Sequence, residues 1–365
     1  MSDPWERLRS LVAEFAVDDE SLEHLLDQAT LWISWSVLHA DPSRPAFHRH
    51  NDLVSQWGGP NADNVYRHAR IHPAKRYVVR GRMHSCEEFI LALRAGFMHN
   101  ETWGTLATIT ASDLGIGAGD DFEFVLGDGG HEIPHGAIMA SVREYYFDWT
   151  AEEPATFTIE CLDPEPVELP PLDDRLHAAV DQVSDSLHYW ADYLASNRAE
   201  RLDNSFASTV ALPAKGLTAA RYEFCFWDLD PGDALIIETD VPAARYWAAQ
   251  LYVMRTFELV DPFGAISSRN HTQVTPSDDG RIRFVVADED PGVPNWLDTT
   301  GQRNGLCTIR WFWPTGDDAP SLAVHRVPLT TVREYLPAST ASVTPEERAG
   351  ELAARQAHLR WRFRT

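Results

Sequence analysis

The sequence predicts a mainly β fold with helical additions (α+β), in which antiparallel strands form sandwich or jelly-roll-like sheets. Two stretches, residues 61–165 and 205–335, contain short β-branched and aromatic runs separated by Gly, Asp and Pro, as antiparallel strands and turns do. Apolar residues at helical spacing fall mainly in residues 1–60, 166–204 and 336–365. We therefore expect two β regions, a long central helix between them, and helices at both ends.

The amino-terminal segment is expected to begin with two helices. Asp3 and Pro4 suit the cap and the first turn of a helix, and Leu8, Leu11 and Phe15 follow at helical spacing. A second run has an apolar face so wide that the rest of the protein must cover it. This face comprises Leu22, Leu25, Leu26, Ala29, Trp32, Ile33 and Val37.

The central and carboxy-terminal helices have equally clear signals. The long amphipathic helix is predicted from the spacing of Leu176, Val180, Val183, Leu187, Trp190 and Leu194. The last helix begins at Thr344, with Pro345 in its first turn and Glu347 completing a capping box. Its end carries basic residues around Trp361, which we interpret as a solvated helix end suited to the dipole, with an anion or RNA patch as the alternative. These residues are Arg355, Arg360, Arg362 and Arg364.

Charge and cysteine content argue against several classes of protein. The chain has 55 acidic and 31 basic residues and a formal net charge of -24, which opposes binding to nucleic acid and to anionic bilayers. Its 4 cysteines form no Cys-x-x-Cys pair, so neither a zinc knuckle nor a redox couple is indicated. The first residues lack the pattern of a signal peptide and no apolar run approaches a membrane span, so we expect a cytoplasmic protein.

Two groups of polar residues in the first β region are candidates for a site. Asn61, Asp63 and Tyr66 lie at a strand entrance, where they either form a turn or supply polar groups to a pocket. In the later strand, Arg143 and Tyr145 should share one face, with Glu144, Tyr146 and Asp148 on the other. Charges buried there are expected to be paired as Arg–carboxylate bridges inside a core, with a catalytic carboxylate or tyrosine as the alternative.

A third group lies in the second β region. Gln250 and Tyr252 alternate onto one strand face, where an amide and a phenol can orient a ligand. Trp296, in a Pro-Gly loop, is interpreted as a plug that seals the sandwich, and the alternative is a stacking platform. The remaining candidates of this group are Trp247, Asn270, His271, Asn295 and Arg310.

Histidine pairs raise the alternative of a bound divalent metal. His48 and His50 are spaced to place both rings on one strand face, and two further pairs are close in sequence. These are His68 with His72 and His131 with His135. Because each pair lacks a third ligand, we predict no metal and no organic cofactor. The absence of a Walker loop, an HExxH helix and a GxSxG elbow is consistent with this expectation.

The second β region resembles a largely uncharacterised bacterial family known as domain of unknown function 1214. The resemblance is carried by YWAAQLY, by DDGRIRFVVADEDPGVPNWLDTTG and by IRWFWP, in the order of that family. More weakly, NADNVY followed by RYVVRGRM is similar to a strand entry and first sheet of related proteins, although Asn64 and Val65 replace the commoner Thr-Leu. The likeness runs from Asn61 to Pro314 and implies a β-sandwich with a pocket between sheets and loops. It implies no particular activity.

From the residues we expect an enzyme that acts by acid–base chemistry on a small, largely apolar metabolite such as a terpenoid, steroid or polyketide. The 13 Trp, 10 Tyr and 16 Phe, interleaved with ionisable residues, predict an aromatic pocket. The candidate catalytic residues are Asp148, Tyr145, His271 and Asp63, and the candidate binding residues are Asn61, Tyr66, Arg143, Trp247, Gln250, Tyr252, Asn270, Asn295, Trp296 and Arg310. Non-catalytic binding of a carbohydrate or lipid is the alternative, and a homo-oligomer stays open.

Overall fold

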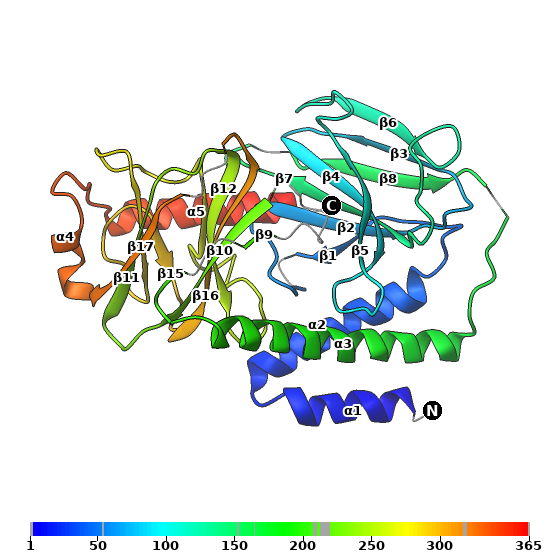
Figure 1. Ribbon diagram of the computed structural model, residues 1–365, viewed down its shortest axis with the longest axis horizontal. Coiled ribbons are helices and arrows are strands. Elements are labelled where there is room, and N and C mark those ends of the chain that lie inside the picture. Colours follow the sequence, from blue (N-terminus) through cyan, green and yellow to red (C-terminus); the bar gives the residue numbers. More distant parts are fainter. Residues whose placement is uncertain are drawn as a thin grey trace.

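The computed structural model confirms a mainly β fold with helical additions, built as two β-sandwiches side by side (Figure 1). The structure describes residues 3–52, 55–151, 153–163, 165–206, 210–211, 220–316 and 320–363. Among these residues, no helix combines the length and the apolar composition needed to cross a bilayer.

The N-terminal sandwich packs a five-stranded sheet on a three-stranded one. The larger sheet contains, in spatial order, β1 (His48–Asn51), β2 (Asn64–Arg70), β7 (Met139–Tyr145), β4 (Glu88–Gly96) and β5 (Gly104–Thr110). The smaller sheet contains β6 (Asp121–Leu126), β3 (Tyr77–Arg82) and β8 (Thr156–Cys161). Apolar side chains such as Phe89, Val142 and Phe157 fill the space between them.

The C-terminal sandwich repeats this plan with a five-stranded and a four-stranded sheet. The first contains β13 (Ser268–Asn270), β12 (Ala244–Val253), β16 (Asn304–Pro314), β10 (Ala220–Asp228) and β9 (Val210–Ala211). The second contains β15 (Trp296–Asp298), β14 (Ile282–Ala287), β11 (Asp233–Thr239) and β17 (Leu322–Pro328). Trp227, Leu251 and Phe284 belong to the core that they enclose.

A third core joins the two sandwiches, because the outer faces of both five-stranded sheets contribute to it. Tyr145 comes from the N-terminal sandwich and Tyr246 and Phe312 come from the C-terminal one. Helices cover this junction from one side (Figure 1). They are α1 (Pro4–Phe15), α2 (Asp19–Ile33), the π-helix η1 (Ser34–Leu38) and the long α3 (Leu172–Ala199). Leu25, Trp32 and Trp190 of the apolar faces predicted for these helices are buried here, whereas Leu26, predicted on the same face as Trp32, is 53% exposed.

The last helix, α5 (Pro345–Arg362), runs from the C-terminal sandwich toward the N-terminal one (Figure 1). Its predicted capping box, formed by Thr344 and Glu347, is confirmed. The solvated interpretation of its basic end is wrong for Arg355 and Arg362, which are buried. Arg355 donates to the Ser268 carbonyl at 3.2 Å and Arg362 to the Ala62 carbonyl at 2.6 Å. Arg360 is exposed, and Arg364 lies outside the described residues.

Three short elements differ from the predicted boundaries: a strand in the segment 1–60 expected to be helical, and two helical turns at the end of the predicted β region 205–335. β1 lies within the segment expected to be helical, and its strand form depends on pairing with β2, a contact that local spacing does not reveal. Before α5, the chain forms a 3₁₀ turn (Leu329–Thr331) and the short helix α4 (Val332–Tyr335).

The alternation predicted for the strand around Arg143 is confirmed, and it generates a buried ion pair. Glu144 faces the N-terminal sandwich core, where it accepts from the Arg67 guanidinium at 2.5 Å and from the Tyr146 hydroxyl at 2.5 Å. The charge on that face is therefore paired with an arginine, as expected, although its partner comes from β2. Electrostatic attraction in the poorly solvated core compensates the cost of burying each charge.

We predict that Arg67→Met lowers the free energy of unfolding by about 3 kcal/mol, because it leaves the Glu144 carboxylate buried without its cation. Urea unfolding followed by circular dichroism measures the change. Arg80→Met is the matched control: Arg80 pairs with Glu123 and Glu160 on the exposed face of β3, where an ion pair contributes about 0–1 kcal/mol. Equal effects of both substitutions would contradict the prediction.

Candidate functional site

A pocket lies at the junction of the two sandwiches, between the outer faces of their five-stranded sheets. It contains about 930 Å³ of empty space, counting its open mouth. The N-terminal sheet, the C-terminal sheet, α3 and the loop before β2 all contribute to its walls. The residues used below are Trp57, Asn61, Tyr66, His68, Arg94, Arg143, Tyr145, Trp190, Tyr193, Tyr222, Phe257, Arg310 and Phe312.

One end of this central pocket is a wall of aromatic rings. The Trp57 and Trp190 ring centroids are 6.2 Å apart, and the Phe257 ring lies 5.6 Å from Trp190. Two glycines allow the loop to approach these rings. Gly58 and Gly59 have φ angles of +66° and +64°, and a Cβ on Gly59 would lie 2.4 Å from the Phe257 ring. Side chains at these positions would therefore push the loop away from the wall.

Three arginines enter the pocket, while none of the described residues that line it is acidic. Arg310 from β16 is 4% exposed and Arg94 from β4 is 6% exposed, and the Nε of each is buried without a hydrogen-bond partner in the described chain. Arg310 donates to the Tyr252 hydroxyl. Burial, with the nearby charge of Arg143, lowers the pKa of Arg94 to about 9.

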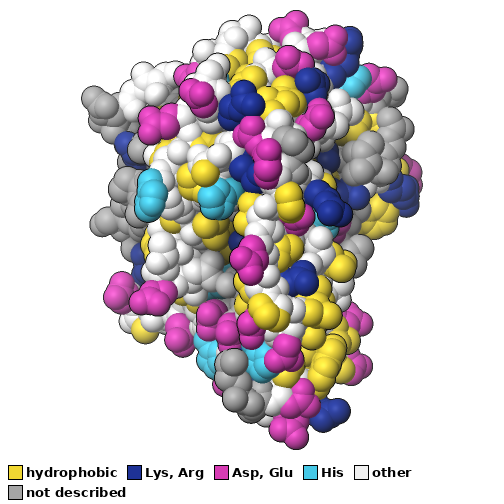
Figure 2. Space-filling view, turned by 90° about the vertical axis from the view of Figure 1, so that its right-hand side faces the viewer, with side chains coloured by type: hydrophobic (Ala, Val, Ile, Leu, Met, Phe, Trp, Pro, Cys, Tyr) yellow, Lys and Arg dark blue, Asp and Glu magenta, His cyan; other side chains and the backbone are white. Residues whose placement is uncertain are grey.

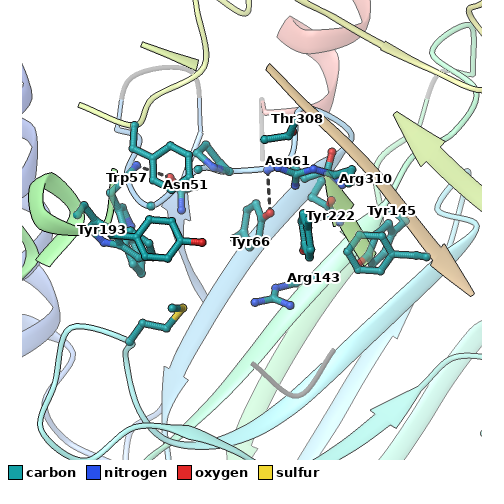
Figure 3. Close-up of a pocket in the computed structure, with 18 of the residues that line it drawn as sticks. Asn51, Trp57, Asn61, Tyr66, Arg143, Tyr145, Tyr193, Tyr222, Thr308 and Arg310 are labelled. Atoms are coloured by element: carbon teal, nitrogen blue, oxygen red, sulfur yellow. Dashed lines mark hydrogen bonds between the residues drawn. The ribbon is translucent and has the colours of Figure 1, made fainter. Parts of the chain in front are cut away.

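Tyrosines surround the basic groups (Figure 3). The Arg143 guanidinium carbon lies 5.9 Å from the Tyr66 ring centroid, and that of Arg310 lies 5.3 Å from the Tyr222 ring centroid. The Tyr66 hydroxyl accepts a hydrogen bond from the backbone N–H of Asn61 at 2.9 Å. Burial raises the pKa of Tyr145 well above its usual range, against the opposing charges of Arg143 and Arg310.

A buried carboxylate behind the pocket holds the loop before β2 in place. Oδ1 of Asp63 accepts from the Trp149 indole at 2.8 Å and from the Asn270 amide at 2.7 Å. Its Oδ2 accepts from the Tyr246 hydroxyl at 2.6 Å and from the Gln250 amide at 3.4 Å. The Asp63 carboxylate is thus the acceptor in all four of these hydrogen bonds.

Asn61 combines the two roles that its sequence position left open. Its side-chain oxygen accepts from the Gln250 amide at 2.6 Å and from the Asp63 amide N–H at 3.0 Å, which is a turn-forming contact. The residue also lines the pocket. Tyr252 anchors the same loop by donating to the Pro60 carbonyl at 2.7 Å.

The predicted site residues therefore fall into three sets. The first lines the pocket and comprises Asn61, Tyr66, Arg143, Tyr145 and Arg310. The second belongs to the polar network behind it and comprises Asp63, Gln250, Tyr252 and Asn270. The third lies away from the pocket and comprises Asp148, Trp247, His271, Asn295 and Trp296. Their catalytic and binding roles stay predictions.

The members of the third set have other contacts. Asp148 is exposed and accepts from the Thr150 hydroxyl at 2.6 Å. His271 is half-buried against Phe147, and burial lowers its pKa. Trp247 belongs to the core of the C-terminal sandwich. The side-chain oxygen of Asn295 accepts a hydrogen bond from the backbone N–H of Thr275 at 2.8 Å. The plug interpretation of Trp296 is supported, because its ring is buried and donates to the Ala287 carbonyl at 3.0 Å.

Several pocket residues outside the predicted site reach it from distant elements. Trp190 and Tyr193 belong to the predicted central helix, and Tyr222 belongs to the second predicted β region. Arg94 gave a usable signal, because it is a single charge at the end of the apolar run FILAL within β4. A buried strand tolerates such a charge poorly unless something neutralises it.

Next to the pocket, four imidazoles form a row that we call the histidine row: His39, His48, His50 and His68. Successive ring centroids are 4.0, 4.5 and 4.4 Å apart. His68 lines the pocket and shares a hydrogen bond with the Ser141 hydroxyl. No group of three or more His, Cys, Asp or Glu side chains in the described ranges has an arrangement that fits a metal ion. The rings of His48 and His50 pack against each other on the same face of β1.

The class that the fold defines is a β-rich protein of two sandwiches with a pocket between them. Residues 232–316 match the family described as "Protein of unknown function (DUF1214)", so the chain carries this domain within its C-terminal sandwich, as the resemblance implied. The amino-terminal part of the resemblance, from Asn61, lies outside this match. No curated protein matches the chain.

A solved structure shows the same fold. The chain is similar to an uncharacterised protein from Burkholderia cenocepacia, with 24% identity, a TM-score of 0.80, and coverage of 90% of this chain and 97% of that one. A second match is the VPA0106 protein from Vibrio parahaemolyticus, with 12% identity, a TM-score of 0.46, and coverage of 82% of this chain and 99% of that one. The first likeness extends over both sandwiches and is a likeness of fold alone.

We predict that Asp63→Asn lowers the free energy of unfolding by about 1–3 kcal/mol. The new amide turns an NH₂ group toward buried donors, so that at least one buried hydrogen bond is lost at a cost of about 1–3 kcal/mol. Chemical unfolding measures the loss. Asp148→Asn is the control: the exposed Asp148 makes only local contacts, so its change should stay within about 0.5 kcal/mol. A tolerated Asp63→Asn would contradict the structural role.

The histidine row predicts a loss of stability in mild acid. Burial lowers the pKa of His48 to about 3 and holds the pKa values of His50 and His68 well below the usual value. The unfolded chain, with histidine pKa values near about 6.5, binds more protons than the folded chain below that pH. The contribution of these histidines to the free energy of unfolding is therefore fully present above about pH 6.5. It decreases as the pH falls, by up to about 1.4 kcal/mol per pH unit for each histidine.

His50→Phe tests this directly, because it removes one titrating ring from an aromatic environment. The slope of the unfolding free energy between about pH 6 and pH 5 should decrease by about 1.4 kcal/mol per pH unit. His325→Asn, on the exposed face of β17, is expected to leave the slope unchanged. An unchanged slope in His50→Phe would show that the row does not take up protons on unfolding.

Proposed function

We propose that the protein is an enzyme that performs acid–base chemistry on a small, largely apolar molecule bound in the central pocket. The observation that supports this most is the convergence of ionisable side chains in one aromatic cavity: Tyr145, His68 and Arg310 come from different strands and line the same space. Enzyme active sites commonly gather titratable groups with shifted pKa values in this way.

Tyr145 is the group that we assign to proton transfer. Its ring is 1% exposed, and its raised pKa keeps the phenol protonated at neutral pH. A protonated phenol can donate to an oxyanion that develops on the substrate, and Arg143 and Arg310 then stabilise the negative charge on the phenolate. Isomerisation, elimination, hydrolysis and cyclisation all need a donor of this kind.

His68 is the second proton-transfer group in the proposal. Because burial keeps the pKa of His68 well below its usual value, its imidazole is neutral at pH 7 and has a nitrogen that can accept a proton. The hydrogen bond with Ser141 orients its ring. A terpenoid, steroid or polyketide body would pack against the rings of Trp57, Trp190 and Phe257.

Non-catalytic binding is the rival function, and the aromatic wall is the observation that favours it. Trp57 and Tyr193 line the pocket, and aromatic rings of this kind can pack against sugars or lipid chains without any reaction. The two functions differ in what happens to the bound molecule, so turnover separates them.

The test combines native mass spectrometry of the purified protein with turnover of a library of terpenoids, steroids and polyketides, read by mass. We expect at least one compound to be isomerised, dehydrated, cyclised or hydrolysed. Tyr145→Phe, which keeps the ring and removes the hydroxyl, should slow that reaction by at least about 100-fold. Tyr335→Phe, at an exposed position, is the control. A bound molecule that stays chemically unchanged while no compound reacts would favour the binding protein.

A further inference from the structure

The central pocket contains more buried positive charge than the described chain neutralises. Arg310 and Arg94 are more than nine-tenths buried, and each has an Nε without a partner in the described residues. Other buried arginines meet a carboxylate or a carbonyl. Three of them pair with a carboxylate: Arg67 with Glu144, Arg269 with Glu351 and Arg348 with Asp290. The other two, Arg355 and Arg362, donate to backbone carbonyls. An unpaired buried cation is costly, and a bound anion relieves that cost.

Two of the three pocket arginines approach one spot from opposite sandwiches. Arg143 comes from β7 of the N-terminal sandwich and Arg310 from β16 of the C-terminal one. In Figure 3 the rings of Tyr66 and Tyr222 lie next to these two arginines. The guanidinium carbon of Arg143 is 5.9 Å from the Tyr66 ring centroid, and that of Arg310 is 5.3 Å from the Tyr222 ring centroid. An anion seated there would contact a guanidinium from each side.

The rest of the pocket determines how such a ligand lies. Trp57 and Tyr193 are at the end away from Arg310 and Tyr145 (Figure 3). An acidic group at the arginine end therefore leaves an apolar body against the aromatic wall. Planar guanidinium groups bind carboxylates and phosphates with paired, charge-assisted hydrogen bonds, which fixes the orientation of the ligand.

We propose that the ligand of the central pocket carries a carboxylate or phosphate group, which binds between Arg143 and Arg310 and thereby clamps the two sandwiches together. This inference rests on the proposed function for the location of the site, and it adds the chemical class of the ligand. The cluster of arginines makes this site locally positive in a chain whose net charge is -24.

The test uses three naphthalene probes that differ only in the attached group: 2-naphthoate, 2-naphthyl phosphate and the neutral 2-naphthalenemethanol. Isothermal titration calorimetry with the full chain measures their affinities. At least one anion should bind tenfold or more tighter than the neutral alcohol, because charge-assisted hydrogen bonds to guanidinium groups are stronger than those of a neutral hydroxyl. The anion that binds more tightly identifies the acidic group. The same anion should raise the thermal midpoint of unfolding.

Arg143→Met is the main variant, because Arg143 is only half-buried and the substitution keeps an unbranched chain of similar length. It should weaken binding of the anion at least tenfold while the affinity for the alcohol changes less than twofold. Arg310→Met should have the same selectivity, and circular dichroism checks that each variant is folded. Arg82→Met, at an exposed position of β3, is the matched control and should bind both probes as the wild type does.

Three results would overturn the clamp: equal affinity for anion and alcohol, no binding of either anion, or unchanged anion binding by Arg143→Met. These outcomes are separate from failure of the proposed function. Anion binding without any turnover would support the clamp and contradict the proposed enzymatic function. Turnover of a neutral compound that depends on Tyr145, without anion binding, would support the enzymatic function and contradict the clamp.

Discussion

The carboxylate of Asp63 is the interaction on which the rest of the structure depends. It receives hydrogen bonds from Trp149 in the N-terminal half and from Tyr246 and Asn270 in the C-terminal half. A single acceptor group thus joins segments that are far apart in the sequence. Because such bonds are buried, each is stronger than its counterpart in water and costly to break. The loop that carries Asp63 is held against the C-terminal sheet in one position.

The central pocket is a consequence of that docking. The loop before β2 reaches the site with Asn61 at its end, and the Gly58-Gly59 pair lets it pass close to Trp190 and Phe257. The two five-stranded sheets then face each other across a space that neither sandwich encloses alone. The helix α5 supports the same junction, since Arg355 and Arg362 bind carbonyls in different halves. Asn61 therefore belongs both to the pocket wall and to the contact between the halves.

Electrostatics in this protein is local. The chain is strongly acidic overall, and on the face seen in Figure 2 acidic and basic side chains are interspersed. At physiological ionic strength, charges more than about 8 Å apart through solvent are largely screened. The buried arginines of the pocket are screened much less, so a ligand there experiences a positive environment. The net charge that argues against nucleic acid does not describe this interior site.

For the strand around Arg143, the face that each residue takes could be predicted, because strand alternation has a period of two. Arg143 and Tyr145 were placed correctly on one face and Glu144 on the other. The same rule failed to describe Asp148, because β7 ends at Tyr145 and alternation no longer applies. It gave no partner for Glu144 either, since Arg67 lies on another strand. Residues such as Trp190 and Tyr222 entered the pocket through long-range packing.

By itself the sequence determined the mainly β class, the helices at both ends and between the β regions, and the DUF1214 likeness of the second β region, because periodicity, capping and turn residues act over a few neighbours. Only the tertiary structure decided that the two sandwiches meet face to face, that Asp63 is a buried acceptor, and that Arg94, Arg143 and Arg310 share one cavity. Those facts arise from contacts between residues far apart in the chain, which no local pattern records.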